Sequence, residues 1–169
     1  MLSLKTAQIK KLFINFAKNN VMDPYALLLK SHSGWRYVVM LTLVLAILSS
    51  FAGWFGKKNF SPGNKKINLF ALISAHIQFV LGLILYFLSP FVKAGEMSVA
   101  MKDDSLRYWT VEHTTMMLIA IVLITVGYSK SKRILDSAAK HKTVAIFYTL
   151  AFIIIITAIV LSGRPVIGS

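Results

Sequence analysis

The sequence predicts an all-α integral membrane protein: an antiparallel four-transmembrane-helix bundle with an N-terminal amphipathic helix. The 169 residues are 56% hydrophobic and have a mean hydropathy of +0.67, more apolar than a soluble domain of this length needs. Four apolar runs are each long enough to cross the hydrocarbon core of a bilayer, about 30 Å thick. The connections between them are short, which predicts an up-down-up-down order of neighbouring helices.

Residues 1–22 predict a basic amphipathic helix that lies in the membrane interface. Apolar side chains recur there with helical spacing, at Ile9, Leu12, Phe13 and Phe16. A signal peptide is the alternative, but the apolar segment LFINFA is too short and no small-x-small cleavage site follows. We therefore divide the chain into an interfacial helix (1–22) and a four-helix transmembrane domain (23–169).

Turn and capping residues delimit the four spans. Asp23 and Pro24 can start the first helix, because Asp caps free backbone N–H groups and Pro suits the first helical position. Pro90 stops the second helix, and Asp103 can cap the third. The predicted spans are about 30–55, 67–89, 107–128 and 143–161.

The formal net charge of +13 comes from Lys and Arg that mostly lie between the hydrophobic runs. That placement suits topology signals and anionic lipid headgroups, so we expect the lipid bilayer as a partner and no nucleic acid. The first and third loops, 57–66 and 129–142, hold 4 + 5 = 9 of these charges. Charges close to a span on the other side number 6, which predicts that these two loops are cytoplasmic.

Cysteine is absent, which excludes disulfides, iron–sulfur ligation and cysteine-anchored haem. A cofactor would have to be held by histidine, methionine or carboxylate. Glu112 and His113 lie near the start of the third apolar run, and His76 lies in the middle of the second. Ionisable groups are costly at that depth, so they indicate a functional site. Two helices that each carry an inward histidine can hold a haem or a metal within a bundle.

The sequence leaves the pairing of histidines open. His76 and His113 would lie about 13.5 Å and 7.5 Å from opposite faces of a 30 Å core, which leaves roughly 9 Å of depth between them. The alternatives are an outer pair, His32 and His113, and an inner pair, His76 and His141, with spacings no better. His32 and His141 flank spans, where a histidine is more often solvated or lipid-facing than a ligand.

Small residues recur beside the predicted ligands, at Ala120 and Gly127 on the third helix and at Ala75 and Gly82 on the second. They would make room for a flat macrocycle on the faces of His113 and His76. They would equally let two bare helices pack closely.

The segments SHSGWRY, AHIQFVLGLILYFLSP, VEHTTMMLIAIVLITVGYSKSKR and KHKTVAIF resemble small bacterial four-helix membrane proteins labelled cytochrome b or cytochrome-b-like. The resemblance covers about Leu27 to Ile159. It implies a multi-pass protein of the bacterial inner (cytoplasmic) membrane, with a haem b between its helices and a part in electron transfer in a respiratory chain. By matching motifs, His76 and His113 would ligate the haem iron, with His32 and His141 as the next candidates.

Three functions follow as hypotheses. The first is a haem-b protein that passes electrons between a quinol and a membrane redox complex, with Arg36 and Arg107 pairing the haem propionates. The second is a cofactor-free structural or accessory subunit of a hetero-oligomer. Its interhelical polar network would consist of His76, Gln78, Glu112 and His113. The third is a proton carrier that uses Glu112 and His113 as a relay. We expect an electron carrier or a subunit rather than a stand-alone enzyme, since no nucleophile constellation or phosphate loop is present.

Overall fold

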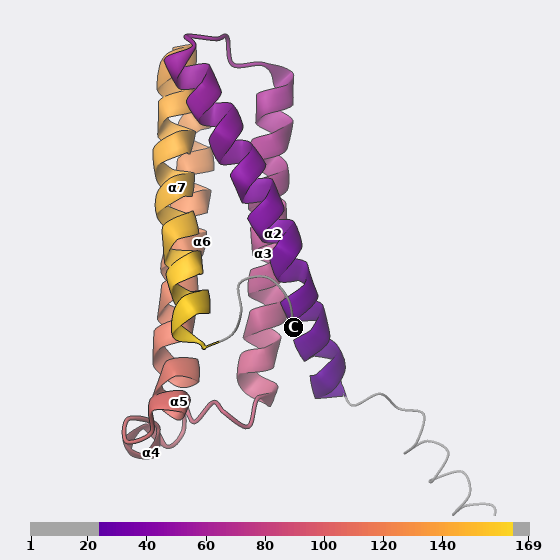
Figure 1. Cartoon of the computed structure of the whole chain (residues 1–169), viewed down its shortest axis with the longest axis vertical. Helices are drawn as coiled ribbons and strands as arrows, with labels where there is room; N and C mark the ends of the chain where they lie inside the picture. The colour runs from indigo at the N-terminus through magenta and orange to yellow at the C-terminus, as the bar shows by residue number, and fades with distance from the viewer. Residues whose placement is uncertain (1–23, 164–169) are drawn as a thin grey trace, which may run out of the picture.

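A computed structural model describes residues 24–163 of the chain (Figure 1). The predicted interfacial helix at 1–22 and the predicted cap Asp23 lie outside the described residues. Four long helices dominate: α2 (Pro24–Phe55), α3 (Pro62–Leu88), α6 (His113–Arg133) and α7 (Ser137–Leu161). Each of them, α6 together with the turns before it, is long and apolar enough to cross a membrane. The prediction of an all-α, multi-pass four-helix bundle is confirmed.

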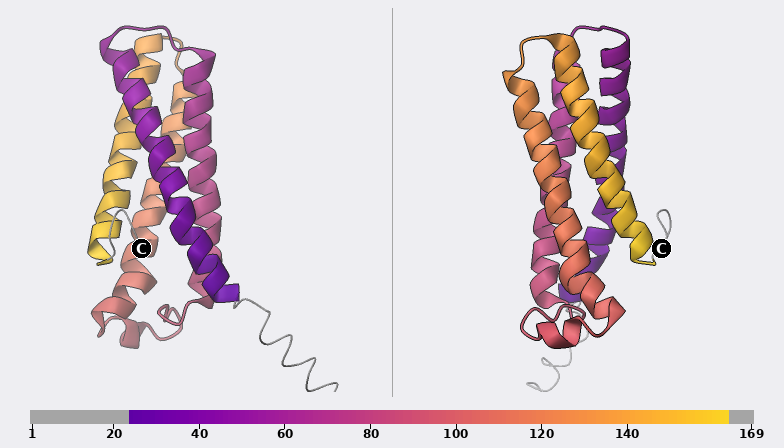
Figure 2. Two further views of the ribbon diagram at one scale, coloured as in Figure 1. Left: turned by 45° about the vertical axis from the view of Figure 1, so that its right-hand side comes forward. Right: turned by 90° about the vertical axis from the view of Figure 1, so that its left-hand side faces the viewer.

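The helices alternate in direction, as Figures 1 and 2 show. Residues 56–61 join α2 to α3 and residues 134–136 join α6 to α7, both at one end of the bundle. The connection from α3 to α6 lies at the other end and contains α4 (Met97–Ala100), α5 (Asp104–Arg107) and a π-helix, η1 (Tyr108–Glu112). Helix α2 packs against both α3 and α7, α7 packs against α6, and α6 approaches α3 only loosely.

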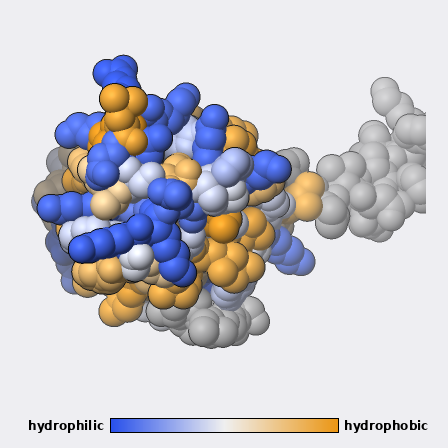
Figure 3. Space-filling view, turned by 90° about the horizontal axis from the view of Figure 1, so that it is seen from above, coloured by the Kyte–Doolittle hydropathy of each residue, from blue (hydrophilic) through white to orange (hydrophobic). Residues whose placement is uncertain are grey.

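The end with the two short connections is strongly basic, and we call it the basic end. Seen from above in Figure 3, hydrophilic side chains cover much of this end of the bundle. Some lysines lie over aromatic rings: Lys140 over Phe60 at 5.4 Å and Lys142 over Trp54 at 5.5 Å. The two loops predicted to share one side of the membrane do lie at the same end of the bundle.

The third loop is much shorter than its composition predicts. We expect a loop over 129–142, but α6 continues to Arg133 and α7 already starts at Ser137. Asp136 caps α7, because its carboxylate accepts a hydrogen bond from the Ala139 N–H at 2.6 Å. Basic residues in the last turn of α6 suit the negative end of the helix dipole. Hydropathy marks where a helix leaves the hydrocarbon, whereas caps mark where it ends.

The bundle is packed most closely toward the basic end. Nine described side chains have no exposed surface, and two of them, Ala100 and Ala158, lie toward the other end. The other seven lie toward the basic end or near the middle of the bundle: Leu43, Ala46, Ala71, Val144, Ala145, Tyr148 and Ala151. Many of them are alanines, which let helix backbones approach one another. Buried polar groups bridge the helices, since Tyr148 donates a hydrogen bond to the Asn68 carbonyl at 2.9 Å and Trp35 donates to the Ser74 carbonyl at 3.0 Å.

His141 lies within this closely packed part and is only 1% exposed. The expectation that a histidine flanking the fourth span is solvated is therefore wrong for His141. Because α7 starts at Ser137, the residue falls within the helix and not in a loop. Its ring packs beside Phe60, with centroids 4.9 Å apart, and against Gly53, where a Cβ atom would collide with the imidazole.

Gly53 is thus a position where a methyl group should disrupt the bundle. We expect Gly53→Ala to lower the free energy of unfolding by about 1–3 kcal/mol, the usual cost of overpacking a core. Gly34→Ala, on the same helix, is the control, because a Cβ there would meet no described atom within 4 Å. Alanine should raise stability at Gly34 by up to about 1 kcal/mol through helix propensity. Thermal unfolding in detergent measures both, and equal melting temperatures would contradict the packing.

Candidate functional site

An apolar cavity of about 150 Å³ lies between the four helices, on the side away from the basic end. Figure 2 shows α2 and α7 diverging toward that end. His32 and Arg36 from α2 and His113 from α6 all line the cavity. Most of the remaining wall is apolar, formed by residues such as Phe79, Leu83, Ile121, Ile124 and Ile155.

Small residues widen the cavity on three sides. Gly82 on α3, Ala120 on α6 and Ala158 on α7 all belong to its wall. At Gly82 an added Cβ would lie 3.0 Å from Cε1 of His32, so the imidazole packs directly on the backbone of α3. A larger residue at this position would displace the ring. Glycine at this position lets the His32 ring reach the interior.

The two cavity histidines lie at similar depths. His32 is eight residues after Pro24, and His113 is nine residues after Asp104, on helices that begin at the same end of the bundle. At 1.5 Å per residue these positions are roughly 12 Å and 13.5 Å along their helices. The structure therefore brings together the outer pair, His32 and His113. The sequence spacing favours this pair no more than the other pairs.

Arg36 adds a half-buried cationic group to the cavity. Its Nη2 atom donates a hydrogen bond to the Tyr37 hydroxyl at 3.0 Å. Its Nε atom is buried and has no acceptor among the residues that the structure describes. A guanidinium N–H without an acceptor is costly, and a carboxylate is the partner that it binds best. The cavity wall thus includes a guanidinium N–H that an anionic group could pair with.

The π-helix η1 determines how His113 is presented. Residues five apart point in different directions on an α-helix, about 140° away from one another, whereas a π turn places them on one side. Here the His113 N–H bonds the Tyr108 carbonyl across the π turn. As a result the Tyr108 hydroxyl lies 3.4 Å from Nδ1 of His113, and Arg107 lies beside Glu112.

Two aromatic rings of the π turn support the His113 imidazole. The ring of Tyr108 lies 5.8 Å from it and the ring of Trp109 lies 5.3 Å from it, centroid to centroid. The Tyr108 hydroxyl donates to the carbonyl of Ala158 on α7, so its oxygen is left as an acceptor toward Nδ1–H of His113. In that tautomer Nε2 carries the lone pair, as a metal-ligating histidine requires.

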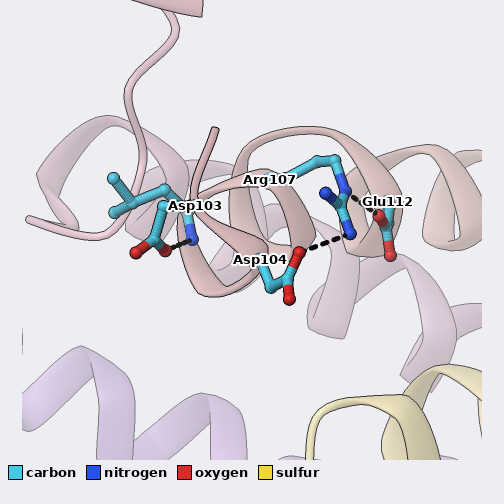
Figure 4. Close-up of polar contacts among 5 residues, drawn as sticks. Asp103, Asp104, Arg107 and Glu112 are labelled. Atoms are coloured by element: carbon cyan, nitrogen blue, oxygen red, sulfur yellow. Dashed lines mark hydrogen bonds and ion pairs between the residues drawn. The ribbon is translucent and has the colours of Figure 1, made fainter. Parts of the chain in front are cut away.

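Arg107 belongs to an ion-pair cluster at the start of this span, shown in Figure 4. It donates to Glu112 at 2.8 Å and to Asp104 at 2.9 Å, while Asp103 caps the helix by accepting from Leu106 N–H at 2.8 Å. Arg107 is not among the residues that line the cavity. Its predicted pairing with a haem propionate is therefore not supported by its position.

Glu112 likewise forms its ion pair with Arg107. The predicted Glu112–His113 relay would need the carboxylate to leave this partner.

His76 lies on the outside of the bundle. It is exposed, it does not line the cavity, and its Nδ1 donates to the Leu72 carbonyl at 2.8 Å. We expected Ala75 and Gly82 to flank the face of His76, but those two residues face the cavity. Successive residues on a helix are 100° apart, so the neighbour of an inward alanine points elsewhere. The structure does not bring His76 and His113 together.

The six predicted site residues thus separate into two groups. His32, Arg36 and His113 meet at one cavity, whereas His76, His141 and Arg107 lie outside it. Within residues 24–163 no cluster of three or more histidines and carboxylates is suited to a bare metal ion. A cofactor that brings its own in-plane ligands, such as a haem, needs only two axial groups from the protein.

No known protein family, curated protein or solved structure matches this chain. The resemblance to cytochrome-b-like proteins therefore stays a prediction, and the function has to be argued from the cavity itself.

Tyr108 is the residue whose loss should disturb His113 most directly. We expect Tyr108→Phe to lower the free energy of unfolding by about 0.5–1.5 kcal/mol, because a buried hydrogen bond to Ala158 is lost. The imidazole ¹⁵N shifts of His113 should change as well. Tyr128→Phe, fifteen residues after His113 on α6, is the control and should leave the ¹⁵N shifts of His113 unchanged. Unchanged ¹⁵N shifts in Tyr108→Phe would show that the hydroxyl does not orient His113.

Proposed function

We propose that the protein binds a haem b in this cavity, where His32 and His113 would hold its iron, and that it takes part in electron transfer in the membrane. One observation carries the proposal: two histidines from different helices reach the same apolar cavity at similar depth. Paired histidines from facing helices are a common way to hold haem iron in a helix bundle.

The remaining wall fits the other parts of a haem. Ala75 and Ala120 offer low surfaces against which a flat macrocycle could lie. The buried Nε–H of Arg36 could pair with a propionate carboxylate, which satisfies both groups. Apolar residues on the remaining sides would exclude water, and such burial helps to set a reduction potential.

Each of these residues would have a separate task. A bound haem would supply one-electron chemistry. Tyr108 would orient the His113 ring through Nδ1, His32 would approach from α2 over Gly82, and Arg36 would neutralise a propionate. The electron donor we propose is a membrane quinol, with a membrane redox complex as the acceptor.

We further propose the bacterial inner membrane as the location, with the basic end in the cytoplasm. Among the described residues nine Lys and Arg lie at the basic end, against five toward the other end, namely Lys30, Arg36, Lys93, Lys102 and Arg107. This asymmetry supports the orientation, since cytoplasmic loops are enriched in basic residues. The cavity would then lie in the outer half of the membrane.

A cofactor-free accessory subunit is the second candidate function. The packing of His32 on Gly82 and of His113 beside Tyr108 and Trp109 favours it, because the protein itself supports both rings. In that case the two histidines would fix how the helices pack, and no chromophore would be present.

Visible absorbance of the detergent-purified protein, oxidised and dithionite-reduced, separates the two functions. We expect a reduced b-type band that His32→Ala and His113→Ala each abolish. His76→Leu is the matched control and should keep the band, because that ring lies outside the cavity. A featureless spectrum from haem-replete cells would overturn the proposal, as would a band that survives His32→Ala and disappears in His76→Leu.

A further inference from the structure

His76 places a polar ring on the outer surface of α3, deep within the membrane. It is fourteen residues after Pro62 and twelve before Leu88, so it lies roughly 21 Å and 18 Å from the two ends of the helix. The ring is exposed in the described part of the chain. Lipid tails offer no hydrogen-bonding groups, and an imidazole at this depth therefore calls for a partner outside the bundle.

The hydrogen bond of His76 defines what such a partner must offer. A carbonyl oxygen can only accept, so Nδ1 carries the proton that is donated to Leu72. In the neutral ring Nε2 is then an acceptor, and no residue between 24 and 163 donates to it. The partner must supply a polar hydrogen at the middle of the membrane.

The surface around His76 is otherwise apolar and grooved. Its neighbours Ile73, Ile77 and Val80 are 45%, 40% and 53% exposed, and with His76 they line a shallow groove. Every other exposed side chain of α3 from Ile67 onward is also apolar. This surface, which we call the α3 face, thus combines one polar group with a hollow that the side chains of another helix could fill.

We propose that the α3 face is a dimer interface with a second copy of this chain, related by a two-fold axis along the membrane normal. Such an axis places each residue near it opposite its own equivalent, at the same depth. The one polar group of the face then meets its own equivalent on the partner at the same depth. A different protein would have to offer a polar group at that depth by itself.

The two His76 rings can form a hydrogen bond because an imidazole has one donor and one acceptor. One copy keeps its proton on Nδ1, bonded to Leu72, and accepts at Nε2. The other copy carries its proton on Nε2 and donates it. That copy gives up its side-chain bond to Leu72, whose carbonyl still accepts the helical backbone bond. Packing of the grooved apolar surfaces adds the van der Waals contact on which transmembrane association depends.

The absence of cysteine allows a direct test, because any introduced cysteine is the only thiol. Ile73→Cys and Val80→Cys each lie about one helical turn from His76. Val122→Cys on α6 and Ile153→Cys on α7 are the controls, with parent side chains that are 56% and 54% exposed. Helix α3 starts at Pro62 and α6 ends at Arg133, both at the basic end. Ile73 and Val122 are each eleven residues from these helix ends, so the two thiols are similarly far from the basic end.

The full chain is oxidised with copper phenanthroline in native membranes. We expect a disulfide-linked product of twice the 18.8 kDa chain mass for the two α3 variants and little for the controls. Equal yields at all four positions, or a product only in a control, would overturn the α3 interface. A linked product of another mass would show that a different protein covers this face.

The hydrogen bond is tested on the Ile73→Cys background. His76→Leu should weaken association by about 3- to 30-fold, the range for one interhelical hydrogen bond in a membrane. His76→Asn, which can both donate and accept, should largely retain the dimer. An unchanged cross-linked fraction in His76→Leu would overturn the role of the histidine. The haem proposal is tested separately, because His76 does not line the cavity.

Discussion

Close approach of the four helices toward the basic end is the constraint on which the candidate site depends. Gly53 accepts the ring of His141, and Gly127 lies where a Cβ would be 2.5 Å from Cβ of Phe147. Helices that come this close at one end and cross at an angle must separate toward the other. The cavity lies on that diverging side. Its polar groups come from helix segments that do not pack closely against another helix.

The π turn then makes the cavity chemically specific. One irregular turn, Tyr108–Glu112, brings two pairs of residues together: Tyr108 with His113 and Arg107 with Glu112. The first pair orients an imidazole toward the interior, and the second forms an ion pair that lies outside the cavity wall. Since π turns are rare and often occur at functional sites, this one supports locating the function at His113.

The fold could be predicted from the sequence, because the bilayer imposes a simple rule on composition and length. The start of the first helix at Pro24 and its end at Phe55 are as expected, and the structure has the expected order of spans. The third loop was predicted too long, because exposed basic residues leave the hydrocarbon without ending a helix. Caps such as Asp136 mark the true ends more reliably than hydropathy does.

The candidate site could be predicted only in part. Of the four small residues that the sequence indicates, Ala75, Gly82 and Ala120 line the cavity, whereas Gly127 packs against Phe147. His76 does not share their face, because it is rotated 100° from Ala75. Counting residues from the helix starts, at Pro24 and Asp104, would have shown that His32 and His113 lie at similar depth. The π turn leaves no clear mark in composition, so the contact of Tyr108 with His113 required coordinates.

The central claim is that His32 and His113 serve one cofactor between the helices, and its most direct test is the electron paramagnetic resonance spectrum of the oxidised protein as purified. Two imidazoles bound to one ferric haem should give a low-spin signal, with one haem per chain. A high-spin signal would show that at most one of these histidines reaches the iron. No ferric haem signal at all would contradict the account and leave the cavity to a structural role.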